Sequence, residues 1–228
     1  MFTRPLPLYL AVCLGCQAFP ATGPVAAPAD DALQQAAACI ERGDEAGAVP
    51  HMVRHIQANP EQIMIRAYLA ELLLRLQRLP EAQWHFERFV AEAQETDGPA
   101  HKQLVHCHTR LMEIAQDRED TYGERLHRGI GLLLLARQEQ ALREANDPDG
   151  LRQKLLCKAV AELKAAHEVR PDEARPCWYL FEVWSALNQP RPAGRALREA
   201  RDAAPFSTAL TPAERRGLAG MGNDPLIQ

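Results

Sequence analysis

The chain has 228 residues, of which 46% are apolar and 25% are charged. This composition is typical of a folded, soluble protein and excludes disorder over most of the length. The net charge of −4 is unevenly spread, from −6 over residues 29–100 to +3 over residues 151–228. Because a nucleic-acid-binding domain usually carries a much more basic surface, we expect no nucleic-acid partner.

The first residues have the pattern of an export signal. Residues 1–16 combine an early arginine, a short apolar stretch and a glycine just before Cys16. The Leu-Gly-Cys ending resembles the lipobox of bacterial lipoproteins, which implies that Cys16 is lipidated and tethers the chain to a membrane. A plain signal cut after Ala18 or Ala27, or an unprocessed cytoplasmic N-terminus, are the alternatives. Residues 17–30, rich in Pro and Ala, are expected to form a linker.

The rest of the chain is predicted to be helical throughout. No stretch alternates apolar and polar residues with β-branched ones, so no sheet is expected. The first helix begins with a capping box of Asp31 and Gln34 and ends at Gly43. Pro50 is expected to bend the second helix or delay its start. The predicted helices cover residues 32–42, 45–58, 63–78, 81–95, 100–116, 120–144, 151–169, 174–188, 191–203 and 212–220.

Four pairs of a small and a large residue recur along these helices. In each half of the chain two such pairs lie 34 residues apart, and in each pair the large residue follows the small one by four. The small residue lets two helix backbones approach closely, and the large side chain fills the space beside it. The pairs are Ala48 and Met52, Ala82 and Phe86, Ala159 and Leu163, and Ala193 and Leu197.

This pattern resembles the tetratricopeptide repeat (TPR) family, whose unit is two antiparallel helices and whose period is 34 residues. The resemblance implies an all-α, right-handed α-solenoid of helix pairs over residues 31–221, with a C-terminal capping helix at 212–220. Residues 222–228 are expected to form a flexible tail. The period breaks in the middle of the chain, where helix 120–144 could be the second helix of one repeat or the first of the next. Gly131 in that helix is expected at a close-packing site.

No catalytic, phosphate-binding or metal-binding pattern stands out. The two serines lie outside nucleophile motifs, and the glycine pairs lack the strand-to-helix context of a phosphate loop. The eight histidines offer no set of three ligands close together in sequence, so we expect no metal, no cofactor and no enzyme activity. Four cysteines fall on apolar helix faces and are predicted to be buried free thiols: Cys39, Cys107, Cys157 and Cys177.

The resemblance further implies a partner protein or peptide held in the groove that first helices line. The aligned groove positions are Met64, Glu71, Arg75, Arg175, Trp178 and Glu182. Trp178, with a charged residue one turn away on either side, has the composition of a binding hot spot. The alternative is that the C-terminal segment folds over Trp178 and makes it part of the core. Trp184 is expected in the core and Trp84 on an outer or inter-repeat surface.

The sequence thus predicts a non-catalytic interaction scaffold of the bacterial cell envelope, exported and tethered through Cys16. A cytoplasmic adaptor of the same fold and an accessory subunit of an enzyme complex are the alternatives. The sequence does not identify the partner.

Overall fold

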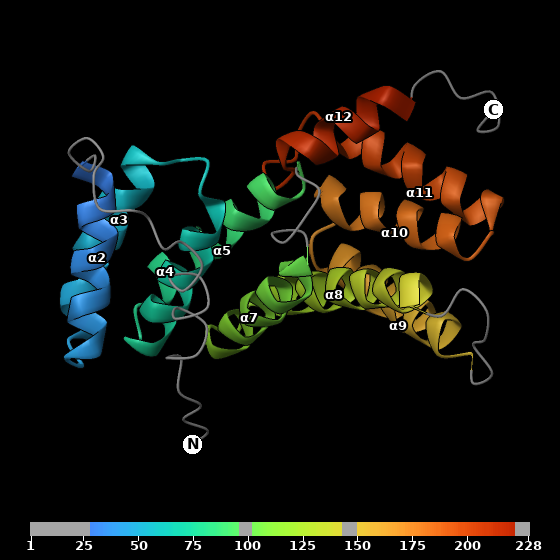
Figure 1. Cartoon of the computed structure of the whole chain (residues 1–228). Helices are drawn as coiled ribbons and strands as arrows, with labels where there is room; N and C mark the ends of the chain where they lie inside the picture. Colours follow the sequence, from blue (N-terminus) through green and yellow to red (C-terminus); the bar gives the residue numbers. More distant parts are fainter. Residues whose placement is uncertain (1–27, 96–101, 143–149, 222–228) are drawn as a thin grey trace.

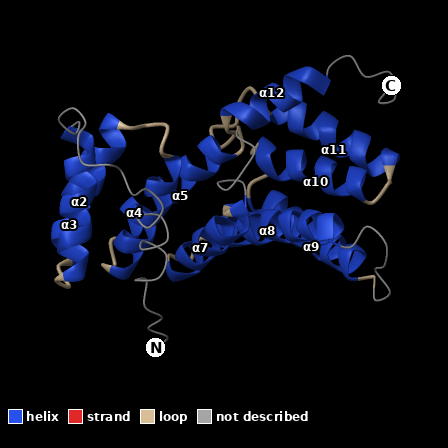
Figure 2. Cartoon of the chain, viewed as in Figure 1, coloured by secondary structure: helices blue, strands red, loops and turns tan. Residues whose placement is uncertain are grey.

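The structure, a computed structural model, describes residues 28–95, 102–142 and 150–221. These residues form ten helices and no strand (Figure 2). None of the described helices combines the length and the apolar character that a membrane-spanning segment requires. The predicted signal with Cys16, most of the predicted linker and the predicted tail lie outside the described residues.

Helices that follow one another pair along the chain (Figure 1). The pairs are α2 (Pro28–Glu41) with α3 (Glu45–Ala58), α4 (Ile63–Arg75) with α5 (Leu79–Ala93), and α10 (Ala174–Ala186) with α11 (Pro190–Ala203). The middle holds α7 (Leu104–Asp117), α8 (Thr121–Leu142) and α9 (Leu151–Val169), and the chain of described helices ends with α12 (Pro212–Gly220). The chain is therefore an α-solenoid of stacked helix pairs, as predicted.

The same turn closes four of the helix hairpins. After α2, α4, α7 and α10, one residue takes a positive φ of 56–76°, and these residues are Gly43, Gln77, Glu119 and Asn188. In each turn the next backbone N–H donates to a carbonyl in the last helical turn, five residues back, at 2.8–2.9 Å. This hydrogen bond satisfies a carbonyl that the helix end would otherwise leave unpaired. Because α7 and α8 share this turn, they form a hairpin of the same kind as the regular repeats.

The helix α8, which lies where the period breaks, packs against both its neighbours. It forms the hairpin with α7 and also packs against α9. At Gly129 it lies so near α9 that a Cβ atom would be 2.7 Å from Cγ of Leu163. Gly131, the predicted close-packing site, instead faces α7, where a Cβ atom would meet only Cβ of His108 at 3.9 Å. The helix α8 is therefore the second helix of the hairpin with α7, and it also packs on α9 as the first helix of a next pair would.

One helix start differs from the prediction, and a second, near a proline, agrees with it. The helix α2 begins before the predicted capping box, because Pro28 suits the first helical position, and Asp31 lies inside the helix. The helix α3 begins at Glu45, capped by the side chain of Asp44, so Pro50 does not delay its start.

The core runs along the helix crossings. The small and large residues of the repeating pairs are at most 5% exposed: Ala48, Met52, Ala82, Phe86, Ala159, Leu163, Ala193 and Leu197. Trp84 is exposed, as predicted, whereas Trp184 is only partly buried, with Lys164 Nζ 5.6 Å from its ring centre. The four described cysteines are free. Cys157 is exposed, contrary to the prediction.

Candidate functional site

The last helix, α12, lies against α10 and α11 (Figure 1). It begins with a capping box, in which Thr211 Oγ1 accepts from the Glu214 N–H at 3.2 Å and Glu214 Oε2 accepts from the Thr211 N–H at 2.8 Å. Gly217 faces Trp178 of α10, and a Cβ atom at Gly217 would lie 2.7 Å from Cη2 of that ring. A residue without a side chain therefore lets α12 pack directly on the indole.

Trp178 is only 7% exposed and belongs to the core. The prediction that it lies in an open groove is therefore wrong, and the alternative, a cover formed by the C-terminal segment, is correct. Seven consecutive residues of α10, from Ala174 to Leu180, are buried. A helix buries such a run only when neighbours cover more than one of its faces, and α9, α11 and α12 all contact α10.

A buried ion pair joins α10 to α12. Arg175 Nε donates to Glu214 Oε1 at 2.9 Å, and the two side chains are 10% and 3% exposed. The same carboxylate oxygen accepts from the Tyr179 hydroxyl at 2.7 Å. Burial acts to lower the pKa of Arg175, but the charge of Glu214 outweighs it and the pKa lies above its ordinary value. The guanidinium stays charged and depends on this one carboxylate as its partner.

Gln94, which directly follows α5 in the N-terminal half, also contacts Tyr179 and the start of α12. Gln94 Nε2 donates to the Tyr179 hydroxyl oxygen at 2.9 Å, and Gln94 Oε1 accepts from Thr211 Oγ1 at 2.9 Å. We call these contacts, together with the ion pair, the α12 junction, made by Gln94, Arg175, Tyr179, Thr211 and Glu214. It links two segments that are 117 residues apart in sequence.

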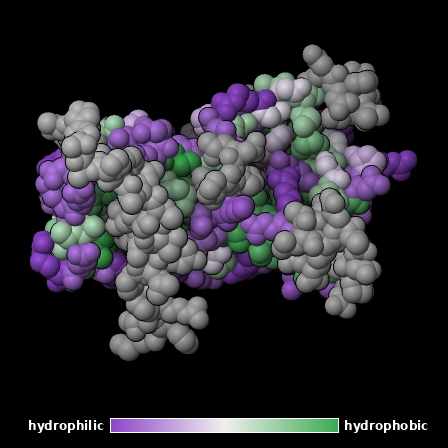
Figure 3. Space-filling view, in the orientation of Figure 1, coloured by the Kyte–Doolittle hydropathy of each residue, from purple (hydrophilic) through white to green (hydrophobic). Residues whose placement is uncertain are grey.

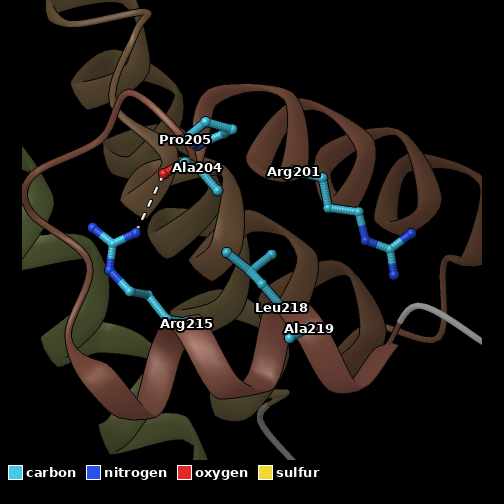
Figure 4. Close-up of a pocket in the computed structure, with 6 residues that line it drawn as sticks. All are labelled: Arg201, Ala204, Pro205, Arg215, Leu218 and Ala219. Carbon is cyan, nitrogen blue, oxygen red and sulfur yellow. Dashed lines mark hydrogen bonds between the residues drawn. The ribbon is translucent and has the colours of Figure 1, made fainter.

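A hollow of about 540 Å³ lies between α11 and α12 (Figure 4). Its lining consists of Arg201, Ala204, Pro205, Arg215, Leu218 and Ala219. Arg215 donates to the carbonyl oxygens of Ala204 at 3.3 Å and of Ser207 at 2.7 Å. Its guanidinium thus bonds α12 to the end of α11, and the hollow is a consequence of how the cover is attached.

In the N-terminal half, Glu71 connects α4 to α7. Its Oε1 accepts from His106 Nε2 at 2.7 Å and from Arg110 Nε at 2.9 Å, and Arg110 Nη1 also donates to Glu113 at 2.7 Å. Burial acts to raise the pKa of Glu71, but the hydrogen bond from His106 and the charge of Arg110 outweigh it, and the pKa is lowered. We call Glu71, His106, Arg110 and Glu113 the α4–α7 face.

The remaining predicted groove residues have partners within the chain as well. Arg75 Nη2 lies 2.7 Å from Glu45 Oε1 of α3, and Glu182 Oε2 lies 3.4 Å from Arg137 Nη2 of α8. Met64 is partly buried against the core. The predicted groove is therefore not one continuous open surface: its charged positions form ion pairs between helices, and its C-terminal part is covered by α12.

Two histidines are buried beside the α12 junction. His108 of α7 and His127 of α8 lie with their Nδ1 atoms 3.0 Å apart. Burial, followed by the charge of Arg175, lowers the pKa of His127 to about 3. Burial, followed by the neighbouring His127, lowers the pKa of His108 well below its ordinary value. Both rings are neutral at pH 7, so one can donate and the other accept in this hydrogen bond.

The sequence did not reveal Gln94, Tyr179 and Glu214 as a group. The one signal available was the capping box, since Thr211 followed by Glu214 marks the start of α12. That signal fixes where the helix begins but carries no information on the surface it covers.

No protein-family model and no curated protein sequence matches the chain. Among solved structures, the chain is similar to TTC0263, a thermophilic TPR protein of Thermus thermophilus, with 18% identity over 87% of this chain and 86% of that one and a TM-score of 0.39. MamA has 13% identity over 75% and 95%, with a TM-score of 0.38. PilW, a type IV pilus biogenesis factor, has 15% identity over 90% and 98%, with a TM-score of 0.34. The fold assignment rests on the helix pairs of this chain.

Proposed function

We propose that this protein is a non-catalytic scaffold that binds a partner protein or peptide on the α4–α7 face. One observation carries the proposal: this face joins two successive helix pairs and keeps its charged side chains partly exposed, at 33% for Arg110, 42% for Glu113 and 48% for His106. The corresponding C-terminal surface is covered by α12, which leaves the N-terminal half as the accessible part.

The chemistry of this face suits a polar chain segment of mixed charge. Partly exposed ion pairs contribute little to the free energy of folding. A charged group of a partner can therefore replace one member of such a pair with little loss of stability. Met64 lies seven residues before Glu71 and therefore on the same side of α4, where it offers an apolar contact. On the molecular face shown in Figure 3, hydrophilic side chains dominate the outer surface over α2, and hydrophobic ones show mainly in recesses between helices.

A capture experiment with matched variants tests this proposal. The full chain, immobilised, is exposed to an envelope extract of its source cells and compared with the double variant Arg110→Ala, Glu113→Ala. The control is Arg78→Ala, Glu81→Ala, which removes an exposed ion pair of the same i, i+3 spacing at the start of α5. We expect a protein that the wild type and the control retain and the first variant loses. Equal retention by all three would contradict the assignment of the face, and retention of nothing would contradict the scaffold.

We also propose that the protein acts in the bacterial cell envelope, tethered by a lipid on Cys16. The support is the Leu14-Gly15-Cys16 pattern after an apolar stretch. Cys16→Ser should release the protein from membranes, whereas Cys13→Ser should leave it anchored. A wild-type protein found in the soluble cytoplasmic fraction would contradict the tether and favour the cytoplasmic adaptor.

A further inference from the structure

Three side chains of metal-ligand type, from three helices, meet at one end of the C-terminal repeat. His167 lies in the last turn of α9, Cys177 in the first turn of α10 and Glu199 near the end of α11. Cys177 Sγ lies 3.4 Å from His167 Nδ1 and 3.9 Å from Glu199 Oε2, and the three ligand atoms all lie within 4.8 Å of one another. Because successive helices reverse direction, the end of α9, the start of α10 and the end of α11 come together.

The separation of Cys177 Sγ and His167 Nδ1 matches that between two ligands on one tetrahedral zinc ion. With Zn–S about 2.3 Å and Zn–N about 2.0–2.1 Å, a sulfur and a nitrogen at the tetrahedral angle lie roughly 3.6 Å apart. The observed 3.4 Å between Cys177 Sγ and His167 Nδ1 needs almost no adjustment. The 3.9 Å to Glu199 is longer, but this side chain is exposed and can turn toward the sulfur without disturbing the core.

We propose that His167, Cys177 and Glu199 bind a zinc ion, with a water molecule as the fourth ligand. Thiolate, imidazole and carboxylate together favour zinc, whereas calcium and magnesium take oxygen ligands. Cys177 is buried and Glu199 is exposed, so the ion enters from the Glu199 side and the water lies there. When the ion binds, the Cys177 S–H bond breaks, the sulfur forms the Zn–S bond as a thiolate, and the proton passes to solvent.

Without the ion the sulfur carries a proton that the zinc ion must displace. Burial, assisted by the charge of Glu199, raises the pKa of Cys177 to about 12, so the group is a neutral thiol. The zinc ion replaces that proton and stabilises the thiolate, as metals do at coordinating thiols. The bound ion links α9, α10 and α11, and it therefore stabilises the half of the chain that α12 covers.

Cobalt provides the direct test, because a cobalt–thiolate bond gives a charge-transfer absorption that oxygen and nitrogen ligands do not. The probe is Co²⁺ added to the full chain, prepared without a histidine tag and with Cys13→Ser and Cys16→Ser to remove two competing thiols. We expect one Co²⁺ per chain with the charge-transfer band, and a melting temperature that Zn²⁺ raises and a chelator lowers. Absence of the band overturns the proposal.

Single substitutions test whether the charge-transfer band arises from Co²⁺ bound at Cys177 and Glu199. Cys177→Ser should abolish it, and Glu199→Gln should weaken Co²⁺ binding by more than about 100-fold, the upper end of what loss of a mere outer-shell partner costs. The control is Cys157→Ser, which removes the exposed thiol of α9 and should leave the band unchanged. A band that survives Cys177→Ser or disappears in Cys157→Ser overturns the proposal. If Cys177→Ser does not fold, Glu199→Gln decides, because an exposed side chain is not needed for folding, and unchanged affinity overturns the site.

Discussion

The helices α4 and α10 are the first helices of two regular repeats and have 13 residues each, but their surroundings differ. The charged residues Glu71 and Arg75 of α4 form ion pairs that reach the surface, whereas Arg175 of α10 is buried with its partner. The difference arises because α12 covers α10 and no described helix covers α4 in the same way. The repeat therefore specifies how helices pair, but not whether the surface of a first helix stays open.

The same difference separates the energetics of the two halves. A buried charge costs several kcal/mol unless its partner is in place, so the pair of Arg175 and Glu214 fixes α12 in one position. A partly exposed pair, such as Arg110 with Glu113, contributes at most about 1 kcal/mol and can be exchanged for contacts with another chain. The buried ion pair fixes α12 on the C-terminal half, whereas the proposed binding face lies in the N-terminal half.

The two tryptophans Trp178 and Trp84 give the strongest test of this contrast. Trp178→Ala removes a buried indole and should lower the free energy of unfolding by about 3–5 kcal/mol, because a cavity forms beneath α12. Trp84→Ala removes a side chain that is 56% exposed and should cost no more than about 0.5 kcal/mol. Urea unfolding measures both values.

Amide hydrogen exchange measures which helices lose stability in Trp178→Ala. Contacts in a solenoid are made mainly between neighbours, so Trp178→Ala should speed exchange in α10–α12 and leave α2–α5 protected. Equal losses of stability for the two tryptophan variants would mean that α12 does not cover α10.

The buried ion pair provides the second test. Glu214→Ala leaves the guanidinium of Arg175 buried without its carboxylate, and this should cost about 3–5 kcal/mol. Glu45→Ala breaks the partly exposed pair with Arg75 in the N-terminal half and should cost no more than about 1 kcal/mol. The double variant Arg175→Met, Glu214→Ala should recover part of the loss, because no unpaired charge is left buried. Absence of any recovery would mean that packing of α12, and not the charge pair, holds the junction.

The parts of the fold that the sequence predicted depend on local signals. The 34-residue spacing and the flanking Pro and Gly residues place the helices, and the bounds of α3 and α9 agree with the prediction. The sequence offered the cover of α10 only as an alternative and could not decide for it, because contacts such as Gln94 to Thr211 join segments 117 residues apart and do not repeat. Trp178 flanked by charges has the same sequence pattern whether those charges meet solvent or residues of other helices. The cluster around Cys177 has no sequence signal either, since its ligands come from three helices.

Acid should weaken the region around the α12 junction. Folding lowers the pKa of His127 from 6.5 to about 3, so below pH 6.5 the unfolded chain binds a proton that the folded chain does not. The stability that the neutral ring contributes is present above about pH 6.5 and falls toward pH 3, by about 1.4 kcal/mol per pH unit. His127→Gln should reduce this slope in urea unfolding at pH 6 and pH 5. The same slope in the variant would show that His127 is not the group responsible.

The smallest difference between the halves is expected at the helix crossings. Ala82 and Ala159 are both fully buried, each at the crossing of its repeat and four residues before a buried Phe86 or Leu163. Replacing either alanine by leucine adds three carbon atoms where two backbones meet, and should cost about 1–3 kcal/mol through overpacking. Because α12 does not change how the hairpins pack, Ala82→Leu and Ala159→Leu should cost the same within about 0.5 kcal/mol, the usual error of such comparisons. Thermal melts of the two variants provide the check. A cost confined to one half would mean that the two stretches do not share one repeat register, and the comparison of α4 with α10 would lose its basis.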